Sequence, residues 1–211
     1  MNITIIGSGK IARALASRFL DAGHNITLVG HTPGKAEALV DELKKQGKKG
    51  DISLAMPNSL PVEIVILAVH YPAVESVIHQ FIEQLPGKIL VDVTNPINFQ
   101  TMEPMIRDGS GAEEIAKLAP VSTRVVKAFN TVFAKNLLAE QVDCAPLDVF
   151  LAGNDADAKS TIARLVEDCG LHPIDTGPLS RARQIEAMEL LHMAIQSSQN
   201  LGYKSTIKIV R

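Results

Sequence analysis

One short segment near the amino terminus constrains the fold of this chain more than any other feature. Gly7-Ser8-Gly9-Lys10-Ile11-Ala12 has the pattern G-x-G-x-x-A. It follows the apolar run Asn2–Ile6, which is typical of a buried β-strand, and it opens a segment with helical spacing. The pattern alone is short, but a strand before it and an amphipathic helix after it form the beginning of a βαβ unit.

The same alternation of strand and helix continues along the chain. Apolar runs at residues 26–29, 63–69, 88–93 and 123–129 predict further strands. Helical spacing separates most of these runs, and parallel strands need such crossover helices. The sequence therefore predicts an α/β fold, a doubly wound parallel (Rossmann) sheet. Residues 94–110 lack periodicity and predict a long loop over the carboxyl edge of that sheet.

The carboxyl-terminal part predicts a small α/β extension of the Rossmann sheet. Its expected elements are strands at 147–152 and 172–175, a helix at 156–169 and a final amphipathic helix at 180–201. The residues expected on the inward face of the final helix are Ile185, Met188, Leu191 and Ile195. We expect a dinucleotide-binding domain over residues 1–140 and a small domain over 141–211 that closes the substrate cleft.

The glycine-rich turn has the features of a phosphate-binding site. Gly7 permits a sharp turn, Gly9 lets the backbone approach a pyrophosphate, and Ala12 keeps the helix close to the sheet. The free N–H groups and the positive end of the helix dipole then face the phosphates. The predicted contacts are Gly7, Ser8, Gly9, Lys10 and Ile11. The alternative is a tight turn that binds nothing.

The end of the second strand favours NADP over NAD. An NAD site normally carries Asp or Glu there, whereas this strand ends Leu28-Val29-Gly30-His31-Thr32 without an acid. His31, Thr32 and Lys35 cluster where a 2′-phosphate would lie, and a carboxylate would repel that phosphate. The alternative is that Thr32 and Lys35 only begin a surface helix.

Three further strand ends meet at the carboxyl edge, where ligands bind in such sheets. The candidate cofactor contacts there are Ala68, Val69, His70, Asn95, Pro96 and Asn130. Asn95 and Asn130 suit the carboxamide of a nicotinamide, although Asn at a strand end also serves in turns. His70 is a candidate proton donor, although a histidine in such a place is more often structural. Asp92 is expected to tether the loop by accepting hydrogen bonds.

Composition excludes several other classes of protein. The 211 residues carry a net charge of -2 and 4% aromatic residues, so we expect no nucleic-acid partner. The apolar runs are too short for a membrane span or a signal peptide. Cys144 and Cys169 are too few for a disulfide framework or a zinc cluster, so we expect a cytoplasmic protein without metal.

Several longer segments make a resemblance specific. They are the GSGKIA turn, Gly23-His24, Lys35-Ala36-Glu37, Lys127-Ala128-Phe129-Asn130-Thr131 and Asp175-Thr176-Gly177-Pro178-Leu179-Ser180-Arg181. Over essentially its full length the chain resembles NADP-dependent oxidoreductases of the coenzyme F-420 (deazaflavin) type, whose domain recurs in the cytosolic part of STEAP-like metalloreductases. The resemblance implies a Rossmann domain with a small C-terminal domain, an acceptor in the cleft over the nicotinamide, and a homodimer.

The chain departs from that family at two places. The family grips the NADP phosphate with a Ser-Arg pair and a Lys, whereas here Gly30-His31 stand at the pair's positions and Lys35 is kept. Residues 94–99 also differ from the deazaflavin enzyme. Three hypotheses follow: an NADPH-dependent reductase of a flavin-like or other small acceptor, a carbonyl or imine reductase of the hydroxyacid or pyrroline-carboxylate type, and a non-enzymatic NADP(H) sensor.

Overall fold

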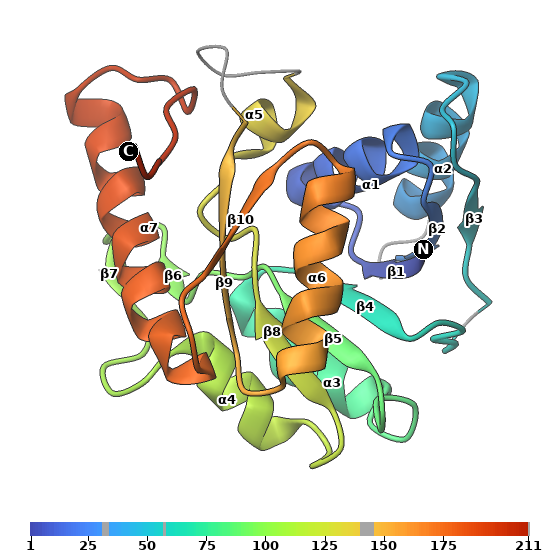
Figure 1. The fold of residues 1–211 in the computed structure, drawn as a ribbon, viewed down its shortest axis with the longest axis horizontal. Coiled ribbons are helices and arrows are strands. Elements are labelled where there is room, and N and C mark those ends of the chain that lie inside the picture. The colour runs from blue at the N-terminus through green and yellow to red at the C-terminus, as the bar shows by residue number, and fades with distance from the viewer. Residues whose placement is uncertain (31–33, 57, 140–145, 211) are drawn as a thin grey trace.

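The computed structural model describes residues 1–30, 34–56, 58–139 and 146–210, and an eight-stranded sheet forms its centre (Figure 1). The strands of this sheet are β1 (Asn2–Ile6), β2 (Asn25–Val29), β3 (Ile52–Leu54), β4 (Ile64–Leu67), β5 (Ile89–Asp92), β8 (Arg124–Lys127), β9 (Asp148–Gly153) and β10 (His172–Asp175). Their order is β10-β9-β8-β5-β4-β1-β2-β3. The pairs are parallel except for β8 with β9, which is antiparallel. The predicted α/β fold with a doubly wound sheet is confirmed.

Helices cover both faces of the sheet. They are α1 (Lys10–Asp21), α2 (Lys35–Lys45), α3 (Val74–Gln80), α4 (Gly111–Leu118), α5 (Ala134–Leu138), α6 (Ala156–Asp168) and α7 (Ala182–Ser198). One apolar core joins α1, α2 and α6 to the sheet through residues such as Phe19, Leu39 and Ile162. A second core joins α3 and α4 through Val77 and Ile115. No helix in the described part of the chain is both long and apolar enough to cross a membrane.

The strand order reverses between β1 and β4, and the backbone is tightly packed there. Gly7 has φ +126° and its N–H donates to the carbonyl of Val29 at 2.8 Å. A Cβ at Gly7 would lie 2.2 Å from the carbonyl oxygen of Ala68, so a side chain has no room. Gly30 directly follows β2, and a Cβ there would lie 2.4 Å from Cβ of Ala36 on α2. Both glycines let the chain turn closely at the edge where parallel sheets bind ligands.

The structure adds elements that periodicity did not predict. The loop at 94–110 contains a short antiparallel pair, β6 (Ile97–Asn98) with β7 (Glu103–Pro104). The helices α4 and α5 and the edge strand β3 were not predicted either, because each is short. A signal for α4 was present in the sequence: Ser110 and Glu113 have the S-x-x-E spacing of a helix start, and the Oγ of Ser110 accepts from the N–H of Glu113.

The prediction of which residues of the final helix face inward is wrong for the second half of that helix. Ile185 is buried, but Leu191 is 65% exposed and Ile195 is 37% exposed. The residues that α7 buries in their place are Glu186, Glu189, His192 and Gln196. Burial of these polar groups is tolerated because each has a hydrogen-bond partner in the fold. Figure 1 shows α7 at one side of the molecule, beside β6 and β7.

Candidate functional site

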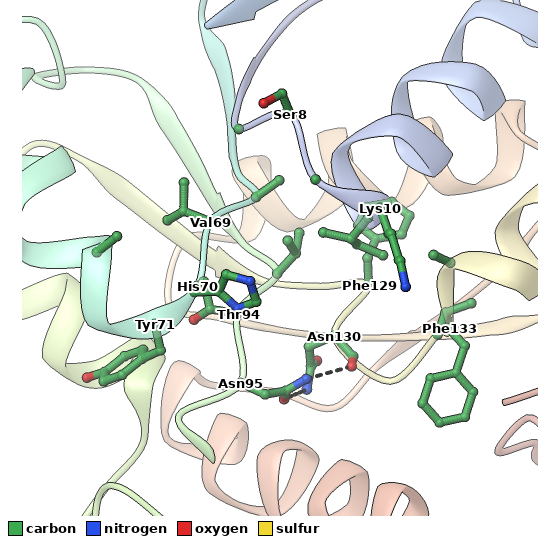
Figure 2. A pocket seen from close by; sticks show the side chains of 18 of the residues that line it. Ser8, Lys10, Val69, His70, Tyr71, Thr94, Asn95, Phe129, Asn130 and Phe133 are labelled. Atoms are coloured by element: carbon green, nitrogen blue, oxygen red, sulfur yellow. Dashed lines mark hydrogen bonds between the residues drawn. The ribbon is translucent and has the colours of Figure 1, made fainter. Parts of the chain in front are cut away.

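A cavity of about 1000 Å³ extends from the turn after β1 along the strand ends to α7. The predicted site residues that line it are Gly7, Ser8, Gly9, Lys10, Ile11, Lys35, Ala68, Val69, His70, Asn95 and Asn130. Pro96 is buried nearby but is not part of the lining. His31 and Thr32 lie outside the described residues. Figure 2 shows Lys10, His70, Asn130 and Phe133 around the same space.

The start of α1 presents uncapped amides to this cavity. Gly9 is the N-cap residue, and no side chain accepts a hydrogen bond from the first turn among the described residues. The first turn also carries no acidic residue. A Cβ added to Gly9 would meet nothing within 4 Å, so the space beside it is open. Free N–H groups, the helix dipole and open space together fit a pyrophosphate.

The second helix adds a cation to the lining of the cavity. Lys35 is the first residue of α2 and lines the cavity. The described end of β2, through Val29 and Gly30, carries no carboxylate. An ammonium at the start of α2, beside a strand end whose described residues carry no acid, fits a 2′-phosphate, as the sequence predicted for NADP.

Asn95 and Asn130 form a reciprocal pair at the ends of adjacent strands. Nδ2 of Asn95 donates to the backbone carbonyl of Asn130 at 3.0 Å, and Nδ2 of Asn130 donates to Oδ1 of Asn95 at 2.9 Å (Figure 2). Oδ1 of Asn130 is buried and accepts no hydrogen bond from any described residue. A buried acceptor without a partner is costly, so a ligand N–H that reaches it would be favoured. The carboxamide of a nicotinamide has such an N–H.

A buried charge cluster holds this strand end in place. Oδ1 of Asp92 accepts from the N–H and the hydroxyl of Thr94 at 2.8 and 2.7 Å, which confirms the predicted tethering role of Asp92. Nζ of Lys127 lies 2.8 Å from Asp92 Oδ2 and 2.8 Å from Glu186 Oε1. Burial lowers the pKa of Lys127, but the two carboxylates outweigh burial and raise this pKa above its usual value. The lysine therefore stays charged.

The helix α7 supplies the opposite wall, which sequence reasoning missed. Glu189 and Met193 line the cavity, and Glu189 is 1% exposed. Its Oε2 lies 3.1 Å from Nδ1 of His192, whose Nε2 lies 2.8 Å from the hydroxyl of Ser205. Burial raises the pKa of Glu189 to about 8 and lowers the pKa of His192. The missed signal was a polar stripe at helical spacing through Glu186, Glu189 and Gln196.

Aromatic rings complete the wall near Glu189. Phe133 stacks on His192 with 4.5 Å between ring centroids, and Tyr203 meets Phe133 edge-on at 5.2 Å. Phe133 and Tyr203 both line the cavity. His70 is exposed on the opposite side, where it meets Phe99 edge-on at 6.1 Å. The end of the cavity at α7 therefore suits a small planar or apolar compound.

Comparison with known proteins identifies relatives over nearly the whole chain. Residues 2–96 match the model of a family described as NADP oxidoreductase, coenzyme F420-dependent. The F420-dependent NADP reductase of Methanocaldococcus jannaschii is 32% identical over 221 residues, which cover 97% of this chain and 95% of that protein. A solved structure from Arthrobacter sp. FB24, described as a candidate F420-dependent NADP reductase, is 29% identical, with TM-score 0.79 and 99% coverage of each chain.

A second group of relatives is longer than this chain. Metalloreductase STEAP3 of Rattus norvegicus is 32% identical over 188 residues, 89% of this chain and 36% of that protein. The chain thus spans about a third of the length of such relatives. The solved structure of the imine reductase of Streptomyces aurantiacus shares the fold, with a TM-score of 0.66 and 20% sequence identity. The match covers 96% of this chain and 64% of that protein.

Proposed function

Because the chain belongs to the family of coenzyme F420-dependent NADP oxidoreductases, we propose that it transfers a hydride between NADP(H) and a flavin-like or other small acceptor in this cavity. The chain is an NADP-dependent oxidoreductase, and NADP is its cofactor. Family membership sets aside the alternative of a non-enzymatic sensor. The observation that carries the proposal is one continuous cavity, which joins the glycine-rich turn after β1 to the acid and aromatic wall around α7.

We place the cofactor along the carboxyl edge of the sheet. The amides from Gly7 to Ile11 would hold the pyrophosphate, and Lys35, with His31 and Thr32, would hold the 2′-phosphate. Asn130 would accept from the carboxamide through its unpartnered Oδ1. Bound NADPH supplies the hydride; the protein orients it and keeps water away from the reacting end.

We place the acceptor between the strand ends and α7. Phe133, Met193 and Tyr203 offer planar and apolar contacts there. Residues 141–211 would then act as the small domain that closes the cleft over residues 1–140, because α7 supplies one wall. A homodimer in the cytoplasm completes the proposal, and light scattering of the purified protein tests the dimer.

The test begins with the cofactor. NADPH and NADH are titrated against the protein by cofactor fluorescence, and a panel of acceptors is then screened for oxidation of the preferred one. We expect NADPH to bind at least about tenfold more tightly than NADH. Equal affinities would contradict the assigned 2′-phosphate site, and binding without oxidation of NADPH by any acceptor would contradict the assigned reaction.

A carbonyl or imine reductase is the second candidate for the reaction. One observation favours it over reduction of a flavin: a buried carboxyl group, that of Glu189, lines the acceptor end of the cavity. Hydride transfer to a flavin-like ring has no need of such an acid.

A further inference from the structure

We propose that Glu189 is the general acid that protonates the acceptor as it receives the hydride, and that the acceptor is therefore a neutral carbonyl or quinone-type compound. This inference rests on the proposed function and narrows it. It depends on the place of one carboxyl group and on what surrounds it. Glu189 lies on α7 in the wall opposite the strand ends, next to the proposed acceptor contacts Phe133 and Met193, and no other step of the proposed reaction uses it.

The two oxygens of this carboxyl group have different surroundings. Oε2 is hydrogen-bonded to Nδ1 of His192 at 3.1 Å. Oε1 makes no hydrogen bond to any residue within the described ranges, and Glu189 lines the cavity. One oxygen is thus held from behind while the other remains available to a ligand. This is the arrangement that a proton donor requires.

A chain of hydrogen bonds leads from Glu189 away from the cavity. Nε2 of His192 lies 2.8 Å from Oγ of Ser205, and Nε2 of Gln196 donates to the same oxygen at 2.8 Å. Ser205 lies in the half-buried segment after α7, next to exposed Lys204. His192 and Ser205 can therefore return a proton from solvent to Glu189 after each turnover.

The surroundings of Glu189 favour the protonated acid near neutral pH. Burial raises its pKa to about 8, which matches a donor that must hold its proton and then release it. The other titratable groups that line the cavity are Lys10, Lys35, His70, Tyr71 and Tyr203. Glu186, one turn earlier on α7, is already paired with Lys127. His192 has a lowered pKa because of burial and is neutral in this pH range.

The proposed step balances in atoms and electrons. The hydride brings to the carbonyl carbon both electrons of the C–H bond of NADPH that breaks. The two π electrons of the C=O bond move to the oxygen. The oxygen takes the proton from Glu189, and the carboxylate recovers a proton through His192 and Ser205. One carbonyl, one NADPH and one proton thus give one alcohol and one NADP⁺. A flavin-like ring, in contrast, can hold the added charge by delocalisation.

The test compares two probes in the whole protein. Phenanthrenequinone is a planar neutral dicarbonyl that needs a proton with the hydride, and FMN accepts a hydride alone. For Glu189→Gln we expect kcat with phenanthrenequinone to fall about 100-fold or more, while the Kd for NADPH and the rate with FMN stay within about twofold. The wild-type rate with the quinone should fall as pH rises above about 8, and Glu189→Gln should lose this dependence.

Two controls make the outcome decisive. Glu167→Gln makes the same change on an exposed part of α6 and should leave both rates unchanged. Glu189→Asp keeps the carboxyl group and should recover part of the quinone rate. In addition, infrared spectra of the NADP⁺ complex should show a protonated carboxyl band at neutral pH that is absent from Glu189→Gln. This last readout needs no turnover.

The failures of the two proposals are distinguishable. An unchanged quinone rate in Glu189→Gln, an equal loss with both probes, or reduction of FMN but not of the quinone by the wild type overturns the role of Glu189. Absence of the infrared band overturns it as well. Failure of the wild type to bind NADPH overturns the proposed function itself.

Discussion

Nζ of Lys127 lies 2.8 Å from Oε1 of Glu186, and this buried pair joins the strand β8 to the helix α7. The same carboxylate accepts hydrogen bonds from the backbone N–H groups of Gly111 and Ala112, at the start of α4. Glu186 therefore fixes α7 against both the sheet and α4. Glu189 follows one turn later on the same face, so the pair also determines where the acid wall of the cavity lies.

Removal of Glu186 should destabilise the fold. Glu186→Ala leaves the buried ammonium of Lys127 with one carboxylate and leaves two amides without an acceptor. We expect a loss of about 3–5 kcal/mol in the free energy of unfolding, measured by urea denaturation. Glu167→Ala on the exposed face of α6 serves as control and should cost less than about 1 kcal/mol. Equal stabilities of the two variants would contradict the assigned role of the pair.

Substitutions at two glycines of the phosphate-binding turn should have different effects, one on stability and the other on cofactor binding. Gly7→Ala forces a Cβ to within 2.2 Å of the carbonyl of Ala68 at φ +126°, so we expect a loss of more than about 3 kcal/mol in stability. Gly9→Val places its side chain in open space, so the fold should remain stable. Binding of NADPH should nevertheless fall by at least about 100-fold, since the side chain occupies the pyrophosphate position. Thermal unfolding and NADPH titration measure the two effects; tight binding by Gly9→Val would place the pyrophosphate elsewhere.

Lys35 should discriminate between the two cofactors. Lys35→Ala removes the cation assigned to the 2′-phosphate, and we expect about tenfold weaker binding of NADPH with little change for NADH. Lys45→Ala, at the other end of α2, is the matched control and should change neither affinity. A parallel loss of both affinities in Lys35→Ala would assign the lysine to the pyrophosphate or to the fold.

Asn130 should affect the reacting end of the cofactor. Asn130→Ala removes the unpartnered acceptor and also the hydrogen bond to Asn95. We expect weaker binding of NADPH by about 1–2 kcal/mol and a lower rate of hydride transfer, measured by titration and by single-turnover absorbance. Asn2→Ala, at an exposed and distant position, should change neither. Wild-type behaviour of Asn130→Ala would move the nicotinamide away from this pair.

Glu189 should make stability depend on pH. Its pKa is about 8 in the folded chain and 4.5 in the unfolded chain, so the folded state binds more protons between these values. Its contribution to stability is complete below about pH 4.5 and is lost as pH rises through about 8, by an amount on the order of a few kcal/mol. Glu189→Gln should remove this slope. Urea unfolding of the wild type and of Glu189→Gln across this pH range measures the slope. If the free energy of unfolding changed with pH equally in both proteins, the carboxyl group of Glu189 would ionise as freely in the folded protein as in the unfolded one.

The local part of the fold could be read from the sequence. The period of the apolar residues changes from two to about 3.6 between β1 and α1, and the glycine-rich turn lies between them. These signals depend on neighbours within a few residues. The same holds for the missing acid after β2 and for Asp92, whose partners on Thr94 lie two residues away.

Contacts between distant segments could not be predicted in this way. The antiparallel junction of β8 with β9 and the pairing of Asn95 with Asn130 join segments that are far apart in the chain. The face of α7 shows the reason most clearly. Apolar spacing predicted that Leu191 and Ile195 point inward, but partners from other elements let the helix bury its carboxylates and histidine instead. The sequence by itself determined the nucleotide-binding half, because its signals are local. Only the tertiary structure decided which side of α7 faces the cavity, because that depends on the distant groups that satisfy each buried polar atom.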